Sequence, residues 1–95
     1  MAAYLVVDCE VTDPRRFETY KAMVPALVAQ FGGKYLARGG AVVPLEGDWN
    51  PERVVIVEFA SIEAARTFIQ SGEYGVARAA RKGAARMRIL AVAGV

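Results

Sequence analysis

The sequence predicts an α+β domain whose elements follow the order β, α, β, β, α, β. Three observations lead to this prediction: an alternating apolar run at residues 4–11, a long amphipathic segment that begins at Pro14, and a strongly apolar run at residues 54–60 that precedes a second amphipathic segment. This order is typical of a ferredoxin-like antiparallel sheet that carries its helices on one face. The opposite face is then bare and needs a cover, which favours an oligomer.

Composition supports one compact domain over residues 1–95, with 55% hydrophobic content and no linker or repeat. Twelve cations and ten acids give a net charge of +2, so nucleic acid is not an expected partner. The single cysteine, Cys9, lies in an apolar run and is expected to be a buried thiol in a reducing compartment. Because Asp8 interrupts the first apolar run, no signal peptide or membrane span is expected, and we predict a cytoplasmic protein.

The first predicted strand, residues 4–11, has two distinct faces. The face that we assign to the helix-packed core carries Leu5, Val7, Cys9 and Val11. The other face carries Tyr4, Val6, Asp8 and Glu10.

A helix follows the first strand, with Asp13 as its N-cap and Pro14 at its first position, and the glycine pair at 32–33 ends it. Pro25 lies inside this helix and is expected to kink or split it, because proline has no N–H to donate.

Two short strand pieces are predicted at residues 34–38 and 42–46, with a glycine bend at 39–40 between them. A buried strand is predicted over residues 54–60. In a sheet of this order the first and third main strands are central, and the last strand lies beside the first. These positions decide which charged residues share a face.

The C-terminal third of the chain is predicted to hold two helices and a strand. Ser61 is the expected cap of a helix that ends at or near Gly72. A third, shorter helix is predicted over residues 73–82, although Gly75 weakens it. The last strand is predicted over residues 88–93.

The chain contains no histidine, which removes the commonest general base near neutral pH and the commonest ligand for zinc, copper or haem. No metal site built on nitrogen and sulfur is therefore expected, and no cofactor is predicted. Acid–base chemistry would fall to Asp, Glu or Tyr, and a carboxylate base would need a pKa raised by burial.

A first set of candidate site residues follows from strand alternation. Asp8, Glu58 and Arg88 fall on the bare face, and Arg38 is expected to join them. In a functional interpretation, a dimer encloses these charges around a cavity, where a carboxylate moves a proton and arginine holds an anionic substrate. In a structural interpretation, which we favour, the charges neutralise one another at the dimer interface.

A second set surrounds the glycine bend at 39–40. Trp49 is a candidate pocket wall with Arg53 nearby, and the glycine amides would approach a ligand closely. The structural alternative, again favoured, has the glycines supplying positive φ while Trp49 packs the loop over the sheet edge or onto a partner. The basic run from Arg78 to Arg88 has no interleaved aromatic residues, so we interpret it as a solvated face.

Motifs along nearly the whole chain resemble one family. They are Ala3-Tyr-Leu-Val-Val-Asp8, Thr12-Asp-Pro14, Tyr20, Gly32-Gly-Lys-Tyr-Leu-Ala-Arg-Gly-Gly40, Leu45-Glu-Gly-Asp-Trp49, Arg53, Glu58-Phe59 and Glu73-Tyr74. Together they resemble domain-of-unknown-function family 1330. The resemblance implies a dimeric α/β barrel, in which two four-stranded sheets pack bare face to bare face, and it implies no established activity. The chain departs from the family pattern at Gly72, where a proline is expected.

These observations predict a homodimeric, uncharacterised small-molecule-binding or accessory protein, with a small anionic or aromatic ligand. One alternative is a cofactor-independent enzyme, isomerase-like or monooxygenase-like, that acts on a small enolic or phenolic compound. The other is a purely structural or protein-interaction module. The candidate bases are Asp8 and Glu58. The candidate ligand-binding residues are Arg38, Trp49, Arg53, Tyr20 and Arg88.

Overall fold

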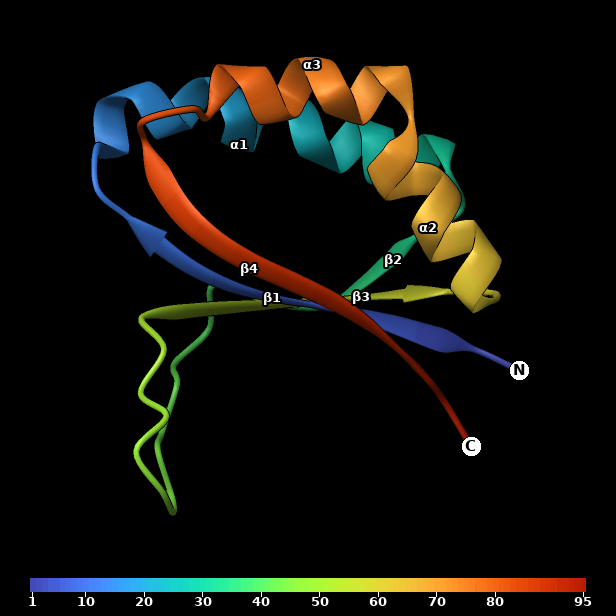
Figure 1. Ribbon diagram of the computed structural model, residues 1–95, viewed down its shortest axis with the longest axis horizontal. Coiled ribbons are helices and arrows are strands. Elements are labelled where there is room, and N and C mark those ends of the chain that lie inside the picture. Colours follow the sequence, from blue (N-terminus) through green and yellow to red (C-terminus); the bar gives the residue numbers. More distant parts are fainter.

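The computed structural model describes all 95 residues and has three helices on one face of a four-stranded antiparallel sheet (Figure 1). The elements are β1 (Ala3–Val11), α1 (Pro14–Gln30), β2 (Lys34–Arg38), β3 (Arg53–Phe59), α2 (Ile62–Gln70), α3 (Gly72–Ala80) and β4 (Ala85–Ala93). The strands lie in the order β2-β3-β1-β4, so β1 and β3 are central and β4 lies beside β1. The predicted fold class and strand order are confirmed.

Alternation along β1 separates a buried face from a bare one. Leu5, Val7 and Cys9 are 4%, 6% and 1% exposed, and they join one core with the aromatic side chains of the helices. We call this side of the sheet the helix side and the other the bare side. On the bare side Asp8 is paired in register with Arg88 of β4. The predicted faces of the first strand are therefore correct.

Helix α1 begins as predicted, because the Asp13 side chain accepts a hydrogen bond of 3.2 Å from the backbone N–H of Arg16 and Pro14 holds the first position. The helix then continues without interruption through Pro25 to Gln30, so the expectation of a split is wrong. Buried residues lie on both sides of the proline at Phe17, Tyr20, Val24 and Val28. Burial of this stripe outweighs the loss of one backbone hydrogen bond.

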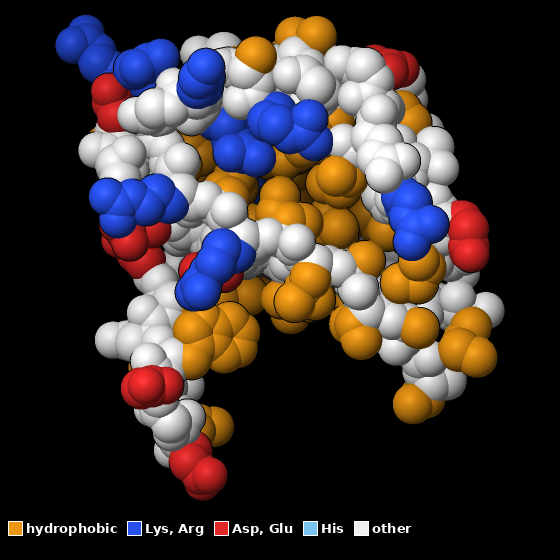
Figure 2. All heavy atoms as spheres, viewed as in Figure 1, with side chains coloured by type: hydrophobic (Ala, Val, Ile, Leu, Met, Phe, Trp, Pro, Cys, Tyr) orange, Lys and Arg blue, Asp and Glu red, His pale blue; other side chains and the backbone are white.

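The connection between β2 and β3, residues 39–52, contains no strand, so the predicted piece at 42–46 is wrong. We call this segment the arm. Figure 1 shows it projecting from the sheet on the side opposite the helices. Pro44 and Pro51 lack the N–H that a sheet ladder requires. Val43, Leu45 and Trp49 of the arm remain 70%, 90% and 57% exposed, and Figure 2 shows hydrophobic side chains along the arm and the lower edge of the sheet.

Ser71 joins α2 to α3 and serves both helices. Its hydroxyl donates to the carbonyl of Phe68 over 2.7 Å and accepts from the N–H of Tyr74 over 3.1 Å. Helix α2 therefore ends at Gln70, close to Gly72 as predicted, and α3 begins at Gly72, one residue before its predicted start. Strand β4 also begins three residues earlier than predicted, because its register with β1 extends to the pair Val11 and Ala85.

Candidate functional site

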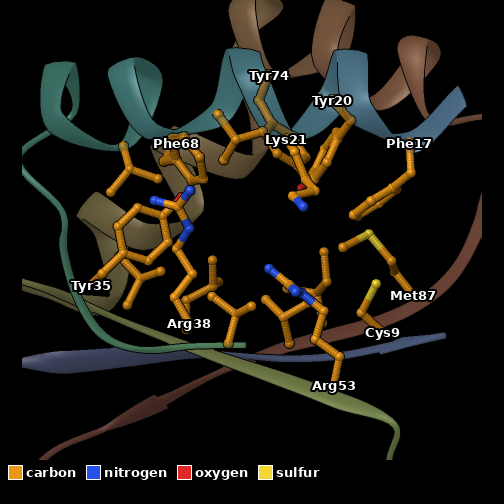
Figure 3. Close-up of a pocket in the computed structure, with 17 residues that line it drawn as sticks. Cys9, Phe17, Tyr20, Lys21, Tyr35, Arg38, Arg53, Phe68, Tyr74 and Met87 are labelled. Atoms are coloured by element: carbon orange, nitrogen blue, oxygen red, sulfur yellow. The ribbon is translucent and has the colours of Figure 1, made fainter. Parts of the chain in front are cut away.

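A cavity lies on the helix side, between the sheet and helices α1 to α3 (Figure 3). Its volume is about 50 Å³, and it opens partly to solvent. Fourteen of its 17 lining residues are hydrophobic. The aromatic members are Phe17, Tyr20, Tyr35, Phe68 and Tyr74. An apolar wall with few polar groups is typical of a small-molecule site.

The three charged residues of the cavity wall are all cations: Lys21 of α1, Arg38 at the end of β2 and Arg53 at the start of β3. Figure 3 shows both arginines rising from the sheet and Lys21 reaching down from the helix. The Lys21 ammonium lies 3.4 Å from the carboxylate of Glu18, outside the cavity wall. Neither arginine has a carboxylate within ion-pair distance. The three salt bridges of the molecule all involve other cations.

Arg38 lies on the helix side, which corrects the expectation that it shares the bare side with Asp8. Tyr35 is opposite Val57, and Ala37 is opposite Ile56, so one extra residue in β2 bulges out of the ladder. A one-residue shift moves every later side chain to the other face. Arg38 is therefore opposite Val55, on the helix side.

Gly39 makes room for the Arg53 side chain. Its φ of +72° lies in the left-handed region, and a Cβ built there would be 2.8 Å from Nη1 of Arg53. A residue with a side chain would therefore be strained and would also displace the guanidinium. Positive φ at this bend was predicted from the sequence, and it occurs at Gly39 but not at Gly40.

Two buried tyrosines, Tyr20 of α1 and Tyr74 of α3, contribute a hydroxyl pair to the same cavity. Their oxygens are 2.9 Å apart. Burial, with Tyr74 as the next cause, raises the pKa of Tyr20 far above its ordinary value, so its phenol stays protonated at neutral pH. Tyr20 is a predicted pocket residue and lines the cavity, whereas Tyr74 lines it without being among the predicted site residues. Its apolar spacing with Ala77 and its place in the family motif were the available signals.

Cys9 also lines the cavity, and burial raises the pKa of its thiol above the ordinary value. A protonated thiol is a poor nucleophile. Burial likewise raises the pKa of Tyr35, even though the nearby charges of Arg38 and Arg53 act in the opposite direction. The cavity therefore holds neutral hydroxyl and thiol groups beside permanent cations.

The bare side carries a separate polar cluster of Asp8, Trp49 and Arg88. The Asp8 carboxylate accepts a hydrogen bond of 3.2 Å from the Trp49 indole N–H and one of 2.7 Å from the Arg88 guanidinium. The Trp49 hydrogen bond, followed by that from Arg88, lowers the pKa of Asp8 below its ordinary value. Asp8 and Arg88 thus form one pair of the charge network that the structural interpretation expected, whereas Arg38 and Glu58 form no salt bridge in it.

Glu58 lies on the bare side but not in this cluster. Its register partners are Tyr4 of β1 and Lys34 of β2. Because Tyr4 is four residues from Asp8 along the strand, Glu58 is roughly 13 Å away from that carboxylate at the rise of a β-strand. The structure thus divides the predicted site residues between the two sides of the sheet. Tyr20, Arg38 and Arg53 meet in the cavity, whereas Asp8, Trp49 and Arg88 meet on the bare side.

No group of three or more His, Cys, Asp or Glu side chains is arranged to hold a metal ion. None of the helices is both long enough and apolar enough to cross a membrane.

A four-stranded antiparallel sheet with helices on one face is the architecture of the dimeric α/β-barrel proteins, and several solved structures share it. A protein of unknown function from Rhodopseudomonas palustris has 19% sequence identity and a TM-score of 0.74, with 99% of this chain and 82% of that chain covered. SnoaB, a cofactor-independent oxygenase from Streptomyces nogalater, has 17% identity and a TM-score of 0.70, with 99% and 93% covered. A putative antibiotic biosynthesis monooxygenase from Nitrosomonas europaea has 13% identity and a TM-score of 0.63, with 99% and 90% covered.

The chain belongs to the family described as Domain of unknown function (DUF1330), whose model matches residues 2–95. This match confirms the family that the sequence motifs resemble. A comparison with curated proteins finds no match.

Proposed function

We propose that the protein is a homodimeric small-molecule-binding protein whose helix-side cavity takes a small, largely apolar organic anion. One observation carries this proposal: Arg38 and Arg53 face an apolar cavity whose wall contains no acid. Cations beside an apolar wall are stabilised by an anion, and hydrogen bonds between guanidinium and carboxylate are among the stronger ones in proteins. Because the wall supplies no such anion, the ligand is expected to bring it.

The bare side is the proposed dimer interface. Leu90 and Val92 of β4 are 58% and 49% exposed there, and Trp49 of the arm is 57% exposed. Val6 lies between Ile56 and Leu90 in the sheet register and extends this apolar surface across β1. A second copy would cover such a face as it does in a dimeric α/β barrel. A reducing compartment such as the cytoplasm suits the free Cys9 thiol.

The test compares acids with their neutral amides. Benzoate, phenylacetate and salicylate are titrated into the purified protein by isothermal calorimetry, beside the three corresponding amides. We expect at least one acid to bind and its amide to bind at least about tenfold more weakly, since a charge-assisted hydrogen bond contributes about 1.5–3 kcal/mol.

Two variants locate the binding site. Arg53→Gln should remove most of the preference for the acid, because the cavity loses a cation that no protein carboxylate occupies. Arg15→Gln is the matched control, since Arg15 is exposed on α1 and does not line the cavity. Equal loss in both variants, or acids that bind no better than amides, would contradict the proposal.

A second candidate function is cofactor-independent catalysis on a small phenolic or enolic compound. It is favoured by the fold shared with SnoaB and by the phenol pair and cations within one cavity. Arg38 and Arg53 would stabilise a developing enolate or phenolate. The role of Asp8 and Glu58 as general bases stays a prediction. Because both lie on the bare side, they would reach only a substrate bound between two subunits. Oxygen consumption with phenolic substrates, measured for the wild type and for Arg53→Gln, tests this candidate.

A further inference from the structure

We infer that the ligand has two polar ends: an anionic group held by Arg38 and Arg53, and an oxygen atom that hydrogen-bonds the Tyr20–Tyr74 hydroxyl pair, with an aromatic body between them. The inference rests on the proposed function and names the ligand class for the same cavity. The class is an aromatic carboxylate that carries a hydroxyl, ether or carbonyl oxygen away from its acid group.

The two polar groups of the cavity come from opposite walls. Arg38 and Arg53 belong to the ends of β2 and β3, whereas Tyr20 and Tyr74 belong to α1 and α3. Figure 3 shows the arginines on the sheet side and both tyrosines on the helix side, with the cavity between them. A ligand that engages both walls therefore needs polar atoms at two separate positions.

The hydroxyl pair has hydrogen-bonding capacity left for a ligand. Each phenol has one proton and an oxygen that accepts. In the 2.9 Å contact one hydroxyl donates to the other, so the accepting hydroxyl keeps its own proton. No other side-chain hydrogen bond is made by either hydroxyl. A buried donor of this kind favours a ligand that presents an acceptor oxygen.

The wall between the polar ends favours a flat, aromatic body. Five of the lining residues are aromatic, and the others that separate the two ends are aliphatic, among them Val24, Val28, Val55 and Val57. Aromatic side chains pack against ligand rings through offset or edge-to-face contacts. A flexible aliphatic acid would lose more conformational freedom in the same space.

The experiment uses ligands of matched size. Benzoate and its 3-methyl, 4-methyl, 3-methoxy and 4-methoxy derivatives are titrated into the wild type and into Tyr20→Phe and Tyr74→Phe, with Tyr4→Phe as the control. Tyr4 is on the bare side and does not line the cavity. Each substitution removes a single oxygen, and circular dichroism checks that each variant is folded.

In the wild type, at least one methoxy acid should bind about tenfold more tightly than its methyl counterpart, the effect of one hydrogen bond to a buried donor. This preference should fall below about threefold in Tyr20→Phe or Tyr74→Phe and persist in Tyr4→Phe. Equal binding of methyl and methoxy acids by the wild type overturns the inference while leaving the proposed function intact. A preference that survives both cavity variants overturns it as well. If none of these acids binds but phenylacetate or salicylate does, the inference fails alone. If no acid of either set binds, the proposed function fails with it.

Discussion

The two sides of one sheet treat their charged residues in opposite ways. On the bare side, Asp8 is bonded to both Arg88 and Trp49. On the helix side, Arg38 and Arg53 face an apolar cavity and no carboxylate is within ion-pair distance of either. Charges that neutralise each other within the chain attract a charged ligand only weakly. Arginines without a carboxylate partner remain able to bind an anion. The comparison supports the proposal that the bare side serves assembly and the helix side serves ligand binding.

The apolar residues of the two sides differ in the same direction. On the helix side, Phe59 and Phe68 are each 1% exposed and pack with ring centroids 5.5 Å apart. On the bare side, Leu90 and Val92 are about half exposed. The helix side thus buries the apolar surface that stabilises the monomer fold, whereas the bare side leaves apolar surface that the proposed second copy would bury.

The largest expected effect comes from the centre of the helix-side core. Phe68→Ala should lower the free energy of unfolding by about 3–5 kcal/mol, because it leaves a cavity among Phe31, Phe59 and Tyr74. Urea denaturation of dilute protein measures the change. Leu90→Ala on the bare side is the control and should change monomer stability by less than about 0.5 kcal/mol. Similar losses in the two variants would remove the distinction between the sides.

The next effect concerns the dimer. Val6→Glu places a charge in the middle of the apolar bare side and should raise the dimer dissociation constant at least about a hundredfold, about 3 kcal/mol. Light scattering after size-exclusion chromatography measures the mass, and circular dichroism reports the fold. Glu63→Gln on α2, an exposed position, should leave the mass unchanged. A Val6→Glu protein that stays dimeric would show that another surface holds the copies together.

A smaller effect is expected at the glycine bend beside the cavity. Gly39→Ala should lower stability by about 1–2 kcal/mol because of its left-handed φ, and it should weaken anion binding by displacing Arg53. Gly40→Ala is a matched control, because a Cβ there meets nothing within 4 Å and its φ is not positive. Thermal unfolding and calorimetric titration provide the two measurements. Equal behaviour of both alanine variants would contradict the role of Gly39.

The smallest effect concerns pH and the bare-side cluster. The pKa of Asp8 is lowered in the folded protein, chiefly by Trp49, so its stabilising contribution is present above the unfolded pKa of about 3.9 and is lost as pH falls through the lower folded value. Trp49→Phe removes the main cause and should move this loss to higher pH. Carboxyl carbon NMR follows Asp8 directly. In an Asp8→Asn background, Trp49→Phe should leave the acid dependence of stability unchanged.

Those parts of the fold that depend on local rules were predictable from the sequence. The Asp13 and Ser61 caps each accept a backbone hydrogen bond as expected, and the alternation of β1 assigns its faces correctly. Local propensity favours a split of α1 at Pro25, but the buried stripe on both sides of the proline keeps the helix continuous. The short apolar run at residues 42–46 favours a strand, but the sheet offers this run no strand partner, so the arm contains none.

The candidate site was harder to predict, for a physical reason. Residue type alone indicated which side chains could bind a ligand, and two of these, Tyr20 and Arg53, do line the cavity. Its placement depended on the bulge in β2, which leaves no recognisable pattern in the sequence and yet moves Arg38 to the other side of the sheet. A single unpaired residue thus decided whether two arginines would share one site.

The arm connects the two sides of the sheet. It follows Arg38 at the end of β2 and precedes Arg53 at the start of β3. Between these two residues, its Trp49 donates a hydrogen bond to Asp8 on the bare side. A partner subunit that rests on the arm would thereby also fix the two guanidinium groups at its ends. Ligand affinity and self-association would then be reciprocal: ligand would tighten the dimer, and concentrating the protein would raise its apparent affinity for ligand by the same factor.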